Sequence, residues 1–197
     1  SGFIGAADGD GSGVLLRVGV ARMVTALGAY LAVIGATGVE RLVELRVGKR
    51  NLAWSKANGG VEHGQGHWPF MVVLHTAFLF GCVVEAVWNP WPMPPALSAA
   101  LFVVAIGCQA LRWWCITTLG RRWNPKVVVV PGGERVTTGP YRFISHPNYV
   151  AVAVEGLVLP LMFGCWRTAL VFTVLNAGLM VVRIRCENDA LEALESS

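Results

Sequence analysis

The segment from Thr137 to Val152, TTGPYRFISHPNYVAV, gathers side chains that could bind a polar aromatic ligand. Pro140 and Pro147 each restrict the preceding residue to extended backbone, so this segment should follow a defined irregular path before a helix begins near Asn148. Tyrosine and histidine rings in such a restricted segment could bind a ligand by stacking and by hydrogen bonds. The alternative is that the tyrosines form an aromatic belt at a membrane surface, with His146 orienting the loop.

A second group of charges follows the last apolar stretch, in the sequence VVRIRCENDALEAL. Arg183 and Glu187 are four residues apart, as are Arg185 and Asp189, so each pair would share one face of a continuing helix. Two solvated salt bridges are the simpler interpretation. The alternative is that this helix and the Pro-rich segment emerge on the same side of adjacent antiparallel helices and share a pocket.

The residue pattern does not favour metal or glycine-rich nucleotide sites. His63 and His67 are four residues apart, but Gly64, Gly66 and Pro69 argue against a helical metal site. The five cysteines are scattered without a CxxC pair, which indicates neither a disulfide framework nor a zinc cluster. The run VVVVPGGERV is strand-like but leads into Pro-Gly-Gly rather than into a helix. The sequence therefore predicts no metal site.

The elements that must position these residues are membrane helices. The chain is 54% hydrophobic and only 14% charged, whereas about a quarter of the residues of a soluble domain are charged. Apolar stretches of about 20 residues can span a bilayer, and such spans are expected over residues 18–39, 68–88 and 96–119. The stretch 150–182 is interrupted by Pro160 and Gly164, which predicts a hairpin of two short or tilted helices. A single span followed by a re-entrant segment is the alternative.

The sequence thus predicts an all-α integral membrane protein with about five transmembrane helices. Residues 14–197 would form a single domain, and residues 1–13 a disordered tail or an expression remnant. Six polar residues inside the apolar stretches need a partner or a cavity: His75, Glu85, Gln109, Arg112, Glu155 and Asn176. Glu155 lies about two turns into the expected fourth helix. We expect it to line a pocket, and the alternative is a bond to a neighbouring helix.

The basic residues predict the orientation in the cell membrane. The connections 40–67 and 120–149 each carry five lysines and arginines, and the connection 89–95 carries none. With five spans, the N-terminus would lie outside and both basic connections and the C-terminus in the cytoplasm. This topology accounts for the net charge of +4, so no nucleic-acid partner is expected. A small transporter or lipid-binding protein is the competing class, but the polar residues gather on one face.

The motifs TGPYRFISHPNY at 138–149, LPL at 159–161 and RIRCEN at 183–188 together resemble the isoprenylcysteine carboxyl methyltransferase family of integral membrane enzymes. The N-terminal half, with ERLVELRVGKRNLAW and LGRRWNPKVVVVPG, looks like a bacterial branch that is associated with type III polyketide synthases. That branch O-methylates alkylpyrones or alkylresorcinols. Carboxyl methylation of a prenylcysteine-like substrate is the alternative that the family implies.

The resemblance implies that S-adenosylmethionine binds at the cytoplasmic face, in a pocket formed by the 120–149 loop and the C-terminal helix. A lipophilic acceptor would enter from the surrounding membrane lipids, and a functional link to a type III polyketide synthase would follow. The implied cofactor-binding residues are Gly139, Tyr141, His146, Pro147, Asn148 and Tyr149. The implied catalytic residues are Arg183 and Glu187, and the implied acceptor-binding residues are Glu155, Trp123 and His67.

Two positions depart from the family pattern. Ser145 stands where the family usually has arginine, so any anion-binding role there is lost or passes to Arg142. Asn188 replaces the second glutamate of the C-terminal motif. Glu187 would therefore carry the carboxylate function alone.

Overall fold

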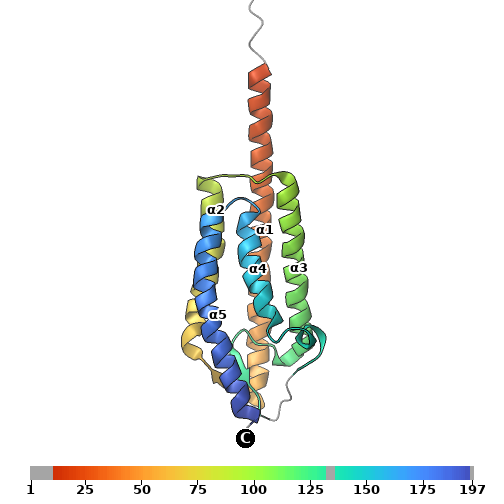
Figure 1. Ribbon diagram of the computed structural model, residues 1–197, viewed down its shortest axis with the longest axis vertical. Helices are drawn as coiled ribbons and strands as arrows, with labels where there is room; N and C mark the ends of the chain where they lie inside the picture. Colours follow the sequence, from red (N-terminus) through yellow and green to blue (C-terminus); the bar gives the residue numbers. More distant parts are fainter. Residues whose placement is uncertain (1–10, 132–135, 196–197) are drawn as a thin grey trace, which may run out of the picture.

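The computed structural model describes residues 11–131 and 136–195, which form a bundle of α-helices (Figure 1). The helices are α1 (Gly11–Ala57), α2 (Trp68–Trp88), α3 (Pro95–Leu119), α4 (Pro147–Leu161) and α5 (Trp166–Glu195). Successive helices run in opposite directions, and α4 packs against both α3 and α5. The connections contain two short strands, β1 (Val61–His63) and β2 (Val127–Val129), and three 3-10 turns, η1 (Gln65–His67), η2 (Gly120–Arg122) and η3 (Gly139–Arg142).

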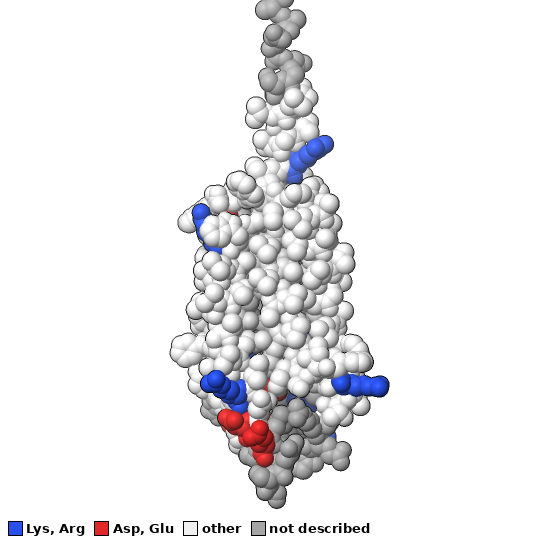
Figure 2. Space-filling model, viewed as in Figure 1, with Lys and Arg blue, Asp and Glu red and all other residues white. Residues whose placement is uncertain are grey.

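Among the described residues, the four helices α1, α2, α3 and α5 are long and apolar enough to cross a membrane. Figure 2 shows charged side chains near the two ends of the bundle and an uncharged band between them. Helix α4 has 15 residues, or about 22 Å, which is shorter than the hydrocarbon core of a bilayer. The predicted all-α membrane fold is confirmed, and the hairpin predicted within 150–182 is the antiparallel pair of α4 and α5.

Helix α1 departs from the sequence prediction. A span over 18–39 followed by a basic loop over 40–67 was expected, but α1 continues to Ala57 and only 58–67 connects it to α2. The reason is that charges end an apolar run without ending a helix. Residues 40–57 are rich in Leu, Glu, Arg, Lys and Ala, which favour helix. Residues 1–10 of the predicted tail lie outside the described residues, and 11–13 belong to α1.

A hydrophobic core occupies the end of the bundle near the turn between α4 and α5. Tyr30 of α1 stacks on Phe163, with ring centroids 5.1 Å apart, and Phe78 of α2 packs on Phe172 of α5 at 4.1 Å. Leu159 of α4 is fully buried in the same cluster. This core fixes one end of the bundle and leaves the opposite end for polar chemistry.

Glu85 of α2 binds the first turn of α5. Its Oε1 accepts a hydrogen bond from the Arg167 N–H at 3.1 Å, and its Oε2 accepts from the N–H and hydroxyl of Thr168 at 2.8 and 2.7 Å. The first N–H groups of a helix lack partners within the helix, and a negative charge there is favourable. The buried carboxylate of Glu85 is therefore a cap for α5.

The two strands connect the other end of the bundle. They are antiparallel, with Val61 opposite Val129, and β2 packs against Ala190 of α5. Glu62 of β1 accepts hydrogen bonds from Lys56 at the end of α1 at 2.6 Å and from Lys126 before β2 at 2.9 Å. The strand-like run noted in the sequence is thus confirmed as β2. The small sheet holds the ends of α1 and α5 beside residues 120–131.

Hydrogen bonds from Lys56 and Lys126 hold the pKa of Glu62 below its ordinary value of 4.5. A carboxyl whose pKa is depressed by folding stabilises the fold above the unfolded-state pKa, and this stabilisation is lost as the pH falls through the folded-state pKa. Glu62→Gln should therefore melt at a lower temperature than the wild type at pH 7. The two melting temperatures should converge as the pH falls below 4.5. A difference that is constant with pH in thermal unfolding scans would contradict this account.

Candidate functional site

Tyr149, in the first turn of α4, joins the two polar groups that the sequence analysis singled out. Its hydroxyl donates a hydrogen bond to the carboxylate of Glu187 and accepts one from Nε of Arg183 at 2.7 Å. The Arg183 guanidinium also lies over the Tyr149 ring, 5.1 Å from its centroid. The structure therefore brings the Pro-rich segment and the C-terminal helix together at one hydroxyl group.

The residues that begin α4 extend this cluster. His146 stacks on Tyr149, with ring centroids 5.2 Å apart, and its Nδ1 is 3.8 Å from Oε2 of Glu187. Pro147 is buried at the first helical position, where the missing N–H costs no helical hydrogen bond. The Oδ1 atom of Asn148 is buried and has no hydrogen-bond partner among the described residues. A ligand donor at this place would satisfy it.

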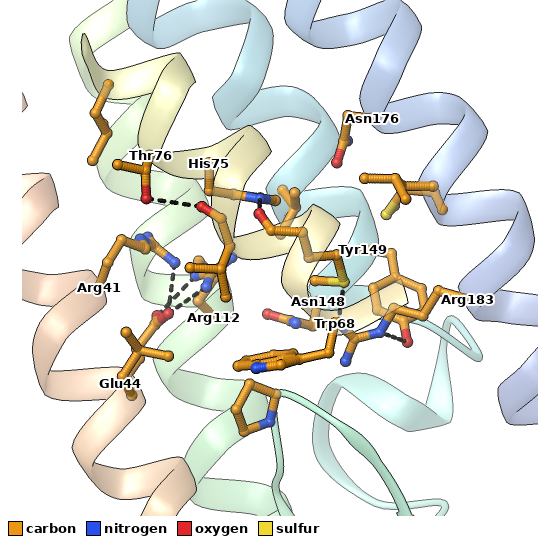
Figure 3. A pocket seen from close by; sticks show the side chains of 18 of the residues that line it. Arg41, Glu44, Trp68, His75, Thr76, Arg112, Asn148, Tyr149, Asn176 and Arg183 are labelled. Atoms are coloured by element: carbon orange, nitrogen blue, oxygen red, sulfur yellow. Dashed lines mark hydrogen bonds and ion pairs between the residues drawn. The ribbon is translucent and has the colours of Figure 1, made fainter. Parts of the chain in front are cut away.

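A cavity of about 390 Å³ opens beside Tyr149 and Arg183 and continues between the helices (Figure 3). Its wall is mostly apolar and comes from α1, α2, α4 and α5, with Arg112 from α3 and Trp123 and Pro125 from the segment after α3. On one side the wall consists of side chains that are exposed on the bundle surface, namely Leu42 and Leu45 of α1 and Val72 and Thr76 of α2. The cavity therefore opens sideways between α1 and α2, toward the lipid.

Buried charges form another part of the wall. Arg112 of α3 donates to both carboxylate oxygens of Glu44 of α1, at 2.9 and 2.5 Å. Arg41 donates to Glu44 at 2.7 Å and to Glu155 of α4 at 3.2 Å. Gln109 accepts from Arg41 at 3.0 Å and donates to Glu155 at 2.9 Å. Arg41, Glu44 and Arg112 line the cavity, whereas Glu155 lies behind Arg41 and lines a small neighbouring cavity.

The three predicted acceptor-binding residues occupy different places. Trp123 lines the cavity, and Glu155 is separated from it by its bonds to Arg41. His67 does not line the cavity, although the next residue, Trp68, does. Burial and the positive charge of Arg183 lower the pKa of His67, so the two side chains affect each other electrostatically.

Gly139 and Tyr141 lie in η3, which packs against α3 rather than along the cavity. Gly139 has a φ of +58°, and a Cβ atom there would collide with Thr118 of α3. Burial, together with the nearby Cys115, raises the pKa of Tyr141. These two residues therefore shape the segment that leads to α4 without lining the cavity, and Tyr141 interacts electrostatically with Glu187 and Tyr149.

Sequence reasoning did not find that α1 and α2 build half of the cavity. The sequence analysis gave no ligand-binding role to Arg41, Glu44, Trp68 or Met71. A signal was present, because Glu40, Arg41 and Glu44 continue at helical spacing from the first apolar stretch. That spacing would have indicated a helix that turns a charged face toward the bundle.

The fold and the site define a multi-pass membrane protein with a polar cluster at one end of a lipophilic cavity. A model of the isoprenylcysteine carboxyl methyltransferase (ICMT) family matches residues 99–193. The chain is 36% identical over 155 residues to the uncharacterized protein YpbQ of Bacillus subtilis (strain 168), covering 78% of this chain and 91% of that protein. The chain therefore belongs to the ICMT family, whose members are membrane methyltransferases that use S-adenosylmethionine.

A second relative is an uncharacterized protein of Haemophilus influenzae (strain ATCC 51907 / DSM 11121 / KW20 / Rd). It is 25% identical over 141 residues, covering 70% of this chain and 80% of that protein. No solved structure matches the chain.

Replacing Arg112 with leucine should destabilise the protein by about 3 kcal/mol, because it removes two hydrogen bonds from the buried carboxylate of Glu44. The double variant Arg112→Leu with Glu44→Leu should recover part of this loss, since neither charge then stays buried without its partner. Arg121→Leu, at an exposed position after α3, is the matched control and should change the melting temperature little. Equal melting temperatures for the Arg112 variant and the wild type in detergent would contradict the role given to this pair.

Proposed function

We propose that the protein transfers a methyl group from S-adenosylmethionine to an oxygen atom of a lipophilic acceptor, specifically an alkylpyrone or alkylresorcinol-type polyketide lipid. The observation that carries this proposal is the cluster of Tyr149, Arg183 and Glu187 at the end of an apolar cavity that opens toward the lipid. Such a cavity suits a ligand with a polar head and a hydrocarbon tail. A type III polyketide synthase would supply an acceptor of this kind.

The residues around α4 fit S-adenosylmethionine. The His146 ring, which stacks on Tyr149, offers an aromatic face to a cationic ligand, and the free Oδ1 of Asn148 offers an acceptor. The Glu187 carboxylate is one third exposed and can pair with a positive charge. When bound, the cofactor supplies a methyl group on a positively charged sulfur. We assign Pro147 and Tyr149 to the same binding segment, which Gly139 and Tyr141 hold in place.

Methyl transfer mainly requires alignment of the reacting atoms and removal of water. Arg183 is 7% exposed and is held by Tyr149, so its guanidinium can orient an anionic acceptor oxygen. A carboxylate or an acidic pyrone enol is already anionic and needs no base. A phenol must lose a proton, and the carboxylate of Glu187 would accept it with His146 as the next group toward water.

The same geometry supports the orientation proposed from the sequence. Arg121, Arg122, Lys126 and Arg142 and the basic residues of the end of α1 belong to segments at the end of the bundle that carries the cluster and the C-terminus. Lysine and arginine are enriched on the cytoplasmic side of membrane proteins. We therefore propose a cytoplasmic site in the cell membrane, with the N-terminus of α1 outside.

Carboxyl methylation of a prenylcysteine-like substrate is the second candidate, favoured by the family match and by the position of Arg183 beside the cavity. Arg183 could orient the carboxylate of such a substrate while the prenyl group fills the cavity. The two candidates differ in the head group of the acceptor, so a comparison of acceptors separates them.

The test uses purified protein in detergent with methyl-labelled S-adenosylmethionine and separate sets of alkylpyrones, alkylresorcinols and prenylcysteines. We expect label in the polyketide lipids, and label in the prenylcysteines would favour the second candidate. Arg183→Leu should abolish transfer, whereas Arg185→Leu, at an exposed position on the same helix, should keep it. Absence of both cofactor binding and label transfer would defeat the proposal.

The effect of Glu187→Gln on turnover should depend on the acidity of the acceptor. With a pyrone acceptor, which is already an anion, turnover at saturation should stay within about tenfold of the wild type. With a resorcinol acceptor, which needs a base, turnover should fall by about 100-fold or more. Direct binding of S-adenosylmethionine to the variant serves as the control for a cofactor defect. An equal loss with both acceptors and unchanged cofactor affinity would show that Glu187 does not act as a base.

A further inference from the structure

Asn176 of α5 is a buried amide in the membrane-embedded part of the cavity. Its residue surface is 5% exposed, it lines the cavity, and no described residue forms a hydrogen bond with its side chain. It lies two helical turns before Arg183, or about 10 Å along the axis of α5. An amide that faces a cavity without a protein partner can form hydrogen bonds with a molecule inside it. Asn176 is therefore available to a polar ligand group at this depth.

His75 of α2 offers a second unpaired atom on the facing wall of the same cavity (Figure 3). Its Nδ1 is 2.9 Å from the carbonyl oxygen of Met71. A carbonyl oxygen can only accept, so Nδ1 carries the hydrogen and Nε2 of the neutral ring is left as an acceptor. No hydrogen bond to this Nε2 is formed within the described part of the chain.

The position of His75 along α2 can be compared with the position of Arg183. Met71, one turn before His75, is in contact with Arg183, whose Nη1 lies 3.1 Å from the Met71 sulfur. His75 is therefore about 6 Å along α2 from the level of that contact. The distance is about the width of a substituted aromatic ring. A ligand ring that presents one oxygen to Arg183 can thus present another group to His75.

Two other polar side chains of the wall, Thr76 and Arg41, are already engaged. The Thr76 hydroxyl donates to the carbonyl of Val72 at 2.8 Å, and Arg41 is bound by Glu44, Gln109 and Glu155. Asn148 has a free oxygen, but it belongs to the start of α4 beside His146 and Tyr149. Asn176 and His75 are therefore the groups that can take a new partner in the deeper part of the cavity.

We propose that His75 and Asn176 bind a hydroxyl group of the acceptor, separate from the oxygen that is methylated. A hydroxyl can donate to Nε2 of His75 and accept from the amide of Asn176, so it satisfies both. A carbonyl or an ether oxygen could accept from Asn176 and would leave His75 unpaired, and a hydrocarbon would satisfy neither.

This inference rests on the proposed function and narrows its substrate class to dihydroxylated aromatic lipids. An alkylresorcinol has a second hydroxyl on the same ring. An alkylpyrone offers a carbonyl at the corresponding place, and the prenyl tail of a prenylcysteine is hydrocarbon. The site thus favours the resorcinol type over both of these acceptors.

The test compares a 5-alkylresorcinol with the 3-alkylphenol of the same chain length, which lacks one hydroxyl. Equilibrium binding to the purified protein is measured without a methyl donor, and KM is measured with S-adenosylmethionine. The wild type should bind the resorcinol about tenfold more tightly or better. Asn176→Leu and His75→Leu should each bring this ratio close to one, through weaker binding of the resorcinol, while the affinity for S-adenosylmethionine stays unchanged.

Thr76→Val is the matched control, because it removes a hydroxyl that is already bonded within α2, and it should preserve the wild-type ratio. Equal binding of the two lipids by the wild type, or binding of neither, would overturn the inference even if the leucine variants fail to fold. So would variants that weaken the binding of both lipids by the same factor. Selective binding of the resorcinol without methyl transfer to any acceptor would support this site and count against the proposed function.

Discussion

The buried ion pair between Arg112 and Glu44 is the interaction on which the arrangement of the helices depends. A charge without a partner inside a bilayer costs several kcal/mol, so α1 and α3 cannot separate without a large loss of stability. Arg41 extends the same network to Glu155 of α4 at 3.2 Å, and Trp113 donates to Glu40 at 2.7 Å. Helices α1, α3 and α4 are thereby fixed at one level, and this level is where the cavity lies.

The short length of α4 sets the depth of the reacting cluster. From the turn that joins α4 and α5, Tyr149 is about 18 Å away along α4 and Arg183 about 26 Å away along α5. On the scale of a hydrocarbon core of roughly 30 Å, Tyr149 lies just beyond the middle and Arg183 near the far edge. A water-soluble cofactor and a lipid can meet at such a boundary. A longer α4 would move Tyr149 out of the bilayer and away from the apolar cavity.

The sequence predicted the bounds of a helix where particular residues mark its two ends. The bounds of α2 matched the expected 68–88, because Trp68-Pro69 begins it and a Pro-rich turn follows it. The meeting of Tyr149 with Glu187 also followed from the motifs and from the antiparallel hairpin. The spacing of residues along the chain did not predict contacts between side chains that are distant in the sequence. Arg183 and Glu187 meet at Tyr149 instead of forming the simple i,i+4 pair, and no local pattern could pair Arg41 with Glu155, 114 residues away.

The membrane setting also determines which contacts can select the acceptor. A hydrocarbon tail that moves from lipid into an apolar cavity exchanges one apolar environment for another, so it gains little free energy. Polar contacts count for more there, because an unpaired polar group surrounded by lipid and apolar side chains has no water to bind. Selectivity should therefore come from the head group at Arg183 and the second polar group at Asn176. The length of the tail should matter less, since the opening between α1 and α2 lets it extend into the bilayer.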